Sequence, residues 1–207
     1  MRHFKQMLQV AAVAIAMITT SAQANTVTGS IWENQFTAAN WAIPANVPGT
    51  TPDVTFTTVD PINFLSGGLY TIGEFLTSGG ANVLTGASDL GNTMLNTIFD
   101  FTGTVSVTNG ETFTVRHDDG LTLVIGGITV IDAPGPTSPE LTTATYFGPS
   151  GTQSFDLVYG ECCGPPAVLQ ISLPLTTSPV PEPSTYAMLL AGLGLVGFSA
   201  RRRNENT

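Results

Sequence analysis

The stretch FDFTGTVSVTNGETFTVRHDDGLTLVIGGITVID, residues Phe99–Asp132, alternates apolar and polar side chains over most of its length. A period of two is typical of a β-strand with one buried face. The alternation stops at an NG pair (109–110), a DDG triplet (118–120) and a GG pair (126–127), and these residue types favour tight turns. We therefore predict four consecutive strands in a meander, with two carboxylates at one hairpin tip.

The rest of the body also favours β structure. Thr, Gly, Pro and Asn are frequent between residues 25 and 178, and helix formers are few, as expected for strands joined by turns. We predict one domain over 25–178, an all-β fold that is an antiparallel β-sandwich or barrel of jelly-roll-like type. Its other predicted elements are strands at 28–32, 53–59, 142–147, 154–159 and 168–173, a helical turn at 72–76 capped by Thr71, and a long loop at 78–92.

Residues 1–24 have the composition of a secretory signal peptide. Arg2 and Lys5 form a basic start, an apolar run follows over 7–18, and Ala22-Gln23-Ala24 is a small-x-small cleavage site. The apolar run is shorter than a bilayer of about 30 Å requires. We expect export with a mature chain that begins at Asn25, and a retained amino-terminal anchor is the alternative.

Residues 179–207 combine a proline-rich motif, an apolar run and a basic tail. The run over 186–200 is predicted to be a helix, and at about 1.5 Å per residue it spans roughly 22 Å, which is short for a permanent anchor. Arginines directly after an apolar helix predict a cytoplasmic carboxyl terminus. The residues on either side of the helix are Pro181, Glu182, Pro183, Arg201, Arg202 and Arg203.

This carboxyl-terminal arrangement resembles a PEP-CTERM sorting signal. The resemblance implies recognition and cleavage by exosortase-type sorting machinery, with transient membrane anchoring through the helix. The released protein would then lie at the cell surface or in the extracellular matrix. A simple tail anchor is the alternative.

The body is acidic once both ends are set aside. It contains one basic residue besides histidine, Arg116, and thirteen Asp or Glu residues, so its formal charge is −12. A nucleic-acid partner requires a basic surface and is excluded. Such a charge keeps an exported protein soluble, and it also attracts divalent cations.

Asp118 and Asp119 are the leading candidates for a metal site. Calcium takes six to eight oxygen ligands, and Asp132, which closes the last predicted strand, could face the same end of the sheet. Successive side chains of a strand point to opposite faces, so Asp118 and Asp119 reach one ion only where the backbone bends between them. The alternative is that both carboxylates hydrogen-bond their own turn.

The segment VRHDDGLTLVIGGITVID resembles the signature hairpin of the protective-antigen-type β-barrel domain of toxins, glycosidase inserts and flocculin adhesins. The matching residues are the DDG triplet at 118–120 and the VID triplet at 130–132, whereas Gly126 stands where the family often has an aspartate. The resemblance implies a cis peptide bond between Asp118 and Asp119. It also implies a calcium ion that bridges these aspartates to sugar hydroxyls.

Cys162 and Cys163 are the only cysteines. Outside the cytoplasm thiols tend to be oxidised, so the pair forms a vicinal disulfide, a bond between chains, or stays reduced, and we favour the vicinal disulfide. A zinc site needs about four ligands, and His117 is the only further histidine of the body. His117 lies in the apolar register of its strand, which favours a buried structural histidine.

No residues are predicted to be catalytic, because no nucleophile motif is present. We expect a binding protein and not an enzyme. The leading hypothesis is a calcium-assisted carbohydrate-binding or adhesive protein of an extracellular polysaccharide matrix. The alternatives are a structural matrix protein without a small-molecule ligand and, less favoured, a secreted glycan hydrolase. Trp32 and Trp41 could stack on sugars, but packing is the commoner role of such residues.

Overall fold

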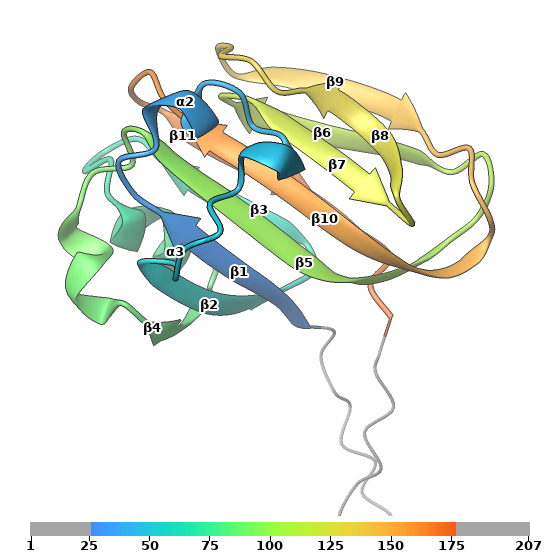
Figure 1. The fold of residues 1–207 in the computed structure, drawn as a ribbon, viewed down its shortest axis with the longest axis horizontal. Coiled ribbons are helices and arrows are strands. Elements are labelled where there is room, and N and C mark those ends of the chain that lie inside the picture. The colour runs from blue at the N-terminus through green and yellow to red at the C-terminus, as the bar shows by residue number, and fades with distance from the viewer. Residues whose placement is uncertain (1–25, 177–207) are drawn as a thin grey trace, which may run out of the picture. The chain divides into compact units, whose positions relative to one another are not determined.

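Two antiparallel sheets form the part of the chain that the computed structural model describes, residues 26–176 (Figure 1). The larger sheet has the strand order β4-β2-β1-β5-β10-β7-β8, and the smaller sheet has the order β3-β11-β6-β9. The strands of the larger sheet are β1 (Thr26–Trp32), β2 (Val54–Val59), β4 (Asn82–Thr85), β5 (Thr97–Val107), β7 (Leu121–Ile125), β8 (Ile128–Ala133) and β10 (Gly151–Glu161). Those of the smaller sheet are β3 (Ile62–Ser66), β6 (Thr112–Asp118), β9 (Glu140–Thr145) and β11 (Ala167–Ile171).

The all-β prediction and its sandwich form are confirmed, and the barrel form is wrong, because the two described sheets stay separate. The predicted meander is also wrong. β5 and β7 lie in the larger sheet and β6 in the smaller one, so only β7 and β8 pair as a hairpin. The sequence period identifies a strand with a buried face but does not say which strand lies beside it.

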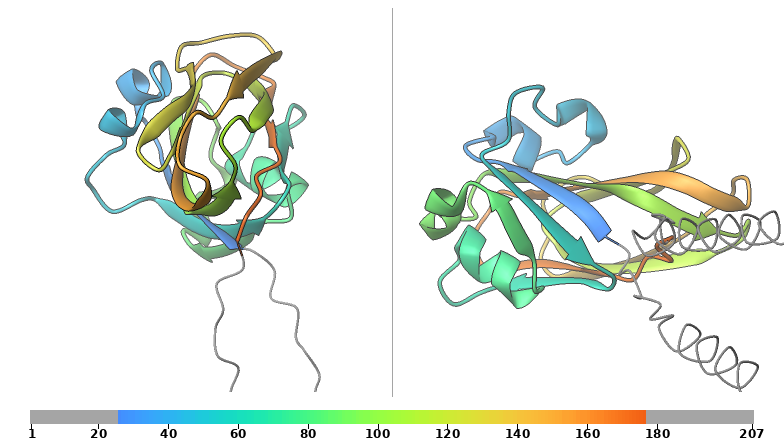
Figure 2. Two further views of the ribbon diagram at one scale, coloured as in Figure 1. Left: turned by 90° about the vertical axis from the view of Figure 1, so that its right-hand side faces the viewer. Right: turned by 90° about the horizontal axis from the view of Figure 1, so that it is seen from below.

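The inward faces of the two sheets enclose an aromatic core. Phe99 and Phe101 of β5 point inward, in agreement with the alternation in the sequence, and both are fully buried. Neighbouring rings lie 5.1–6.2 Å apart between centroids, within the range in which aromatic pairs attract one another. The rings are those of Phe56, Phe64, Phe75, Phe99, Phe101 and Tyr159. Figure 2 shows the arrangement of the strands in two further views.

The helical turn predicted at 72–76 is present as α3 (Ile72–Ser78), and the hydroxyl of Thr71 accepts a hydrogen bond from the Glu74 N–H at 3.2 Å. The predicted loop at 78–92 instead contains β4 and the 3₁₀ turn η2 (Ala87–Gly91). β4 forms because its backbone pairs with β2 at the edge of the larger sheet, although its side chains are mostly exposed. Such a strand carries little hydrophobic signal in the sequence.

A short helical excursion covers part of the outer face of the larger sheet. It consists of α2 (Phe36–Ala39) and the 3₁₀ turn η1 (Pro44–Asn46), and the sequence did not predict it. Ala38 and Ala42 of this excursion pack against Ile98 and Val158 of the sheet. The contact requires glycine at position 160, where a Cβ atom would lie 2.4 Å from the Ala39 carbonyl oxygen.

The predicted signal peptide and the predicted apolar helix over 186–200 lie outside the described residues. Within residues 26–176, no helix is long and apolar enough to cross a membrane.

Candidate functional site

Asp118 and Asp119 lie where the chain crosses from the smaller sheet to the larger one. β6 ends at Asp118 and β7 begins at Leu121, so the pair belongs to a crossing between sheets and not to a hairpin tip. The peptide bond between the two aspartates is cis, as the family resemblance implied. Both side chains are buried, with exposures of 4% and 2%.

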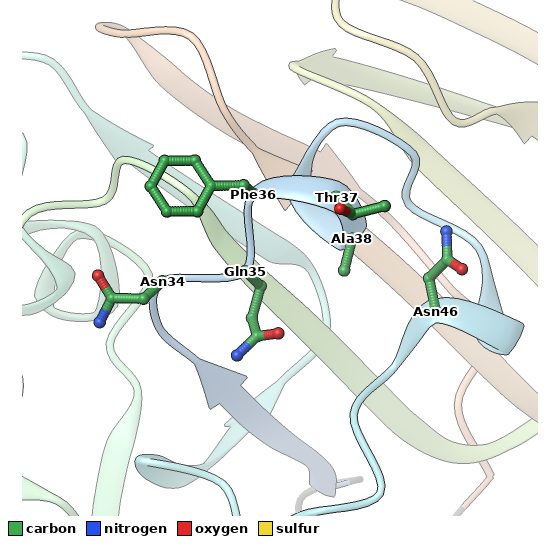
Figure 3. A pocket seen from close by; sticks show the side chains of 6 residues that line it. All are labelled: Asn34, Gln35, Phe36, Thr37, Ala38 and Asn46. Carbon is green, nitrogen blue, oxygen red and sulfur yellow. The ribbon is translucent and has the colours of Figure 1, made fainter.

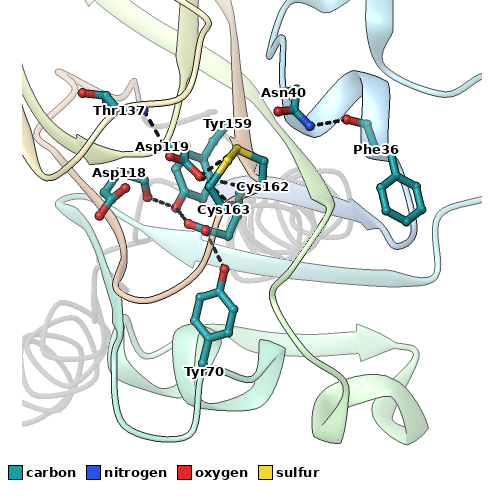
Figure 4. The surroundings of a disulfide bond; sticks show 10 residues. Phe36, Asn40, Tyr70, Asp118, Asp119, Thr137, Tyr159, Cys162 and Cys163 are labelled. Carbon is teal, nitrogen blue, oxygen red and sulfur yellow. Dashed lines mark hydrogen bonds between the residues drawn. A yellow bond between two sulfur atoms is a disulfide. The ribbon is translucent and has the colours of Figure 1, made fainter.

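The Asp119 carboxylate is held by backbone N–H groups from two other segments. Its Oδ2 accepts hydrogen bonds from the N–H groups of Cys162 at 2.9 Å and of Cys163 at 3.1 Å. Its Oδ1 accepts one from the N–H of Thr137 at 3.1 Å. Hydrogen bonds to a charged acceptor are stronger than neutral ones, so Asp119 fixes both loops relative to the crossing (Figure 4).

The Asp118 carboxylate has a different environment. No hydrogen bond from a donor in residues 26–176 reaches it, and it contacts the Asp119 carboxylate. Burial and the neighbouring Asp119 charge raise the pKa of Asp118 to about 6, against a smaller opposing effect of Arg116. A buried carboxylate beside a second one is stabilised by a cation or a proton.

Cys162 and Cys163 form a disulfide bond, with their Cα atoms 3.7 Å apart. Their sulfur atoms and an Asp119 oxygen lie within 4.8 Å of one another. Thiolates are the form in which cysteine binds metals, and oxidised sulfur atoms do not provide them. The disulfide therefore acts here through the loop it holds, whose two N–H groups bind Asp119.

Glu161 is a buried acid that the sequence analysis missed. It is fully buried at the end of β10, where the Tyr70 hydroxyl donates to its Oε1 at 2.6 Å. The Tyr159 hydroxyl lies 2.9 Å from its Oε2 and also contacts the carbonyl oxygen of Asp118. Burial, followed by the charge of Asp119, raises the pKa of Glu161 to about 8, although the Tyr70 hydrogen bond lowers it. Because Tyr159 carries one hydroxyl proton, a neutral Glu161 supplies the second proton that these contacts need.

His117 is a buried structural histidine. Its Nδ1 lies 2.6 Å from the Asp119 carbonyl oxygen and its Nε2 lies 2.7 Å from the Thr142 hydroxyl. Both ring nitrogens therefore have partners within the fold, and the imidazole supports the backbone of the crossing.

Asp132 lies on the outer face of the larger sheet, directly opposite Thr122. No hydrogen bond within residues 26–176 joins it to Asp118 or Asp119, so its assignment to their site stays a prediction. The predicted sorting residues Pro181, Glu182, Pro183, Arg201, Arg202 and Arg203 lie outside the described residues.

A shallow pocket of about 340 Å³ lies beside α2 and is lined by amide side chains and one aromatic ring (Figure 3). Asn34, Gln35 and Asn46 provide the amides, and Phe36 is 65% exposed. Phe36 and Asn40 also belong to the surroundings of the disulfide in Figure 4. Of the two tryptophans, Trp32 is buried and Trp41 is 53% exposed.

Comparison with known proteins identifies the carboxyl-terminal segment. Residues 179–203 match the PEP-CTERM protein-sorting motif, which confirms the predicted sorting signal and indicates an exported protein processed by an exosortase-type enzyme. No curated protein matches the chain.

Two solved structures share the fold of the body. The PA14 sugar-binding domain from an RTX adhesin is 23% identical, with a TM-score of 0.52 over 72% of this chain and 88% of its own. The body has a PA14-like fold. The PA14 domain of the MpAFP antifreeze protein is 21% identical, with a TM-score of 0.55 over 77% of this chain and 88% of its own. The similarity is to PA14 domains in general and not to protective antigen specifically.

Proposed function

We propose that this exported protein is an adhesive carbohydrate-binding module of the cell surface or of an extracellular polysaccharide matrix, and that Asp118 and Asp119 hold a calcium ion that coordinates sugar hydroxyls. The sorting motif supports the location. The PA14-like fold, shared with a domain described as sugar-binding, supports the ligand class.

The observation that carries the proposal is the asymmetry of the Asp118–Asp119 pair. Backbone N–H groups fix the Asp119 carboxylate, whereas the contacting Asp118 carboxylate has no donor within the described residues. A preorganised carboxylate pair on which Arg116 has only a small effect suits a hard cation, since calcium prefers oxygen ligands. The cation also removes the repulsion that raises the pKa of Asp118.

The pocket beside α2 supports a sugar as the ligand. Exposed aromatic rings stack on the apolar faces of sugars, and amide groups both donate and accept hydrogen bonds to hydroxyls. Phe36 provides the ring, and Asn34, Gln35 and Asn46 provide amides. Phe36 is among the residues drawn around the disulfide whose loop binds Asp119 (Figure 4).

The second candidate is a structural matrix protein without a ligand. It is favoured by the three hydrogen bonds that Asp119 accepts, because they show that this carboxylate already stabilises the fold. A glycan hydrolase is not favoured at the same residues. The two catalytic carboxyl groups of a glycoside hydrolase lie about 5–9.5 Å apart. The carboxyl groups of Asp118 and Asp119 are in contact with each other.

Calorimetric titration of the purified protein with calcium, followed by glycan binding with calcium or with chelator, tests the proposal. Asp118→Asn is the informative variant, since the Asp118 carboxylate accepts no described hydrogen bond and its loss leaves the Asp119 contacts in place. Asp89→Asn is the matched control for a lost charge. We expect Asp118→Asn to lose one calcium ion and all calcium-dependent glycan binding, with the control unchanged. Equal calcium and glycan binding by wild type and Asp118→Asn would refute the proposal in favour of the structural role.

A further inference from the structure

A second carboxylate pair lies on the outer face of the larger sheet, at its centre. The register places Asp100 of β5 and Thr122 of β7 on opposite sides of Val158, the β10 residue that both of them face. Asp156 lies two residues before Val158 on the same strand. Side chains two apart on a strand share a face, so Asp156 points outward together with Val158.

The intervening residues confirm this orientation. Phe99 and Phe101 flank Asp100, and Leu121 and Leu123 flank Thr122, and all four belong to the core between the sheets. The side chains of Asp100, Asp156 and Thr122 therefore lie on the opposite face, grouped around Val158. Asp100 and Asp156 are diagonal neighbours on adjacent strands, and their carboxyl groups are in contact.

Three oxygen atoms of this group are buried without a hydrogen-bond partner. They are Oδ1 of Asp100, Oδ1 of Asp156 and Oγ1 of Thr122, and they are three of the four such side-chain atoms found in residues 26–176. The Thr122 residue is 97% buried, with an exposure of 3%. Buried polar atoms are nearly always paired in folded proteins, and unpaired ones call for a ligand or a water. Their concentration at one place indicates a ligand-binding group.

The negative charge of Asp100 and Asp156 favours a positively charged ligand. Asp100 and Asp156 are two acidic side chains in contact with each other. The only lysine or arginine in the described residues is Arg116, on β6 of the other sheet. No lysine or arginine side chain of the described residues therefore neutralises the two carboxylates.

The helical excursion packs beside this group on the outer face of the sheet. Ala38 and Ala42 of the helical excursion pack on Val158 beside Asp100, and the N–H of Ala42 donates to the Pro134 carbonyl oxygen at 3.0 Å. Asp100 and Asp156 are themselves only partly buried. The two carboxyl groups therefore meet solvent in part, although one oxygen atom of each is buried, and both lie on sheet strands and not on a loop.

We propose that Asp100, Asp156 and Thr122 form a second site, which binds a hard divalent cation. All three ligand atoms are oxygens, as calcium and magnesium require. The site is independent of Asp118 and Asp119, because it uses other residues on the outer face of the larger sheet.

Calorimetry with calcium and with magnesium, on the purified protein and on three variants, tests this site. We expect one ion to be lost in Asp156→Asn while the calcium-dependent glycan binding assigned to Asp118 is retained. The converse result is expected for Asp118→Asn, so the two sites fail separately. An unchanged number of bound ions in Asp156→Asn would overturn the second site and leave a shared proton as the explanation of the pair.

Thr122→Val is the variant that separates a cation site from a merely strained polar group. Valine has nearly the shape of threonine and removes the unpaired hydroxyl, so the fold is preserved. With chelator we expect an equal or higher melting temperature, and with calcium or magnesium about tenfold weaker binding at the second site. A variant that binds the ion as tightly as the wild type would contradict a role for Thr122 as a ligand and overturn the site as assigned.

Discussion

The two carboxylate pairs of this protein differ in what surrounds them. At the crossing between sheets, Asp119 accepts three backbone hydrogen bonds and organises two loops. On the outer face of the larger sheet, Asp100 and Asp156 each leave one oxygen atom unpaired. The same chemical group therefore stabilises the fold where hydrogen-bond donors converge on it and weakens the fold where they do not. We propose a cation at both pairs, but only the first pair also connects separate loops of the fold.

The largest effect is expected from Asp119→Ala. The substitution leaves three N–H groups of Cys162, Cys163 and Thr137 without their acceptor, and hydrogen bonds to charged groups contribute about 1.5–3 kcal/mol each. We expect a loss of about 3 kcal/mol or more in the free energy of unfolding. The matched variant Asp156→Ala should change it by about 1 kcal/mol or less, since its unpaired oxygen and its repulsion of Asp100 are removed. Denaturant unfolding in chelator measures both, and similar losses in the two variants would show that Asp119 and Asp156 contribute equally to stability.

The pH dependence of stability is expected to be large and of unusual sign. The pKa values of Asp118, Asp100 and Glu161 are raised to about 6, about 7 and about 8. Between the ordinary carboxyl pKa and these values the folded state binds more protons than the unfolded state, so stability falls as the pH rises from about 5 to 8. One pKa unit corresponds to about 1.4 kcal/mol.

Thermal unfolding in chelator from pH 5 to pH 9 measures this slope. For the variant Glu161→Gln we expect a smaller fall in stability between about pH 7 and 8, because the variant has no Glu161 carboxyl that ionises there. Calcium should reduce the slope further by binding the ionised forms of both aspartate pairs. A stability that rises with pH over this range would show that these carboxyls are ionised more easily in the folded state.

A smaller effect is expected from Asp118→Asn without cations. The amide removes the repulsion between the two contacting carboxylates, and no described hydrogen bond to Asp118 is lost. We expect a gain of about 1 kcal/mol at pH 8, where Asp118 is ionised, and little change at pH 5. The same variant should lose the added stability that calcium gives the wild type. Destabilisation in chelator would mean that the Asp118 carboxylate is held by donors after all.

The smallest change in stability is expected from the double variant Cys162→Ser and Cys163→Ser. A bond between adjacent residues closes almost no loop, so the unfolded chain gains little freedom when it is removed. We expect a loss of about 1 kcal/mol or less. The loop that presents two N–H groups to Asp119 is nevertheless less constrained, so the calcium affinity should fall severalfold. Calorimetry separates these effects, and unchanged affinity would show that the disulfide plays no part in shaping the site.

The local pattern of the sequence predicted much of the fold but little of its pairing. Alternation placed Phe99 and Phe101 in the core, and Thr71 marked the start of α3, because burial of a strand face and capping of a helix depend on nearby residues. The predicted meander was wrong because β6 and β7 lie in different sheets. β4 was missed because it is an edge strand held by backbone pairing with few buried side chains.

The candidate sites also include residues that are adjacent in the sequence and residues that only the fold brings together. The adjacency of Asp118 and Asp119 was visible, whereas the contact between Asp100 and Asp156 joins residues 56 positions apart on two strands. Glu161 also gave no signal, because its burial depends on Tyr70, which belongs to a distant segment.

The amino-acid sequence by itself determined the acidic, strand-rich character of the body and its sorting motif, since composition, short periodicity and a linear signal need no folded partner. The tertiary structure alone decided which carboxylates meet and which donors they find. Those contacts depend on strand order and on loops packed across sheets, and long-range pairing of this kind is not encoded in the period of any one strand.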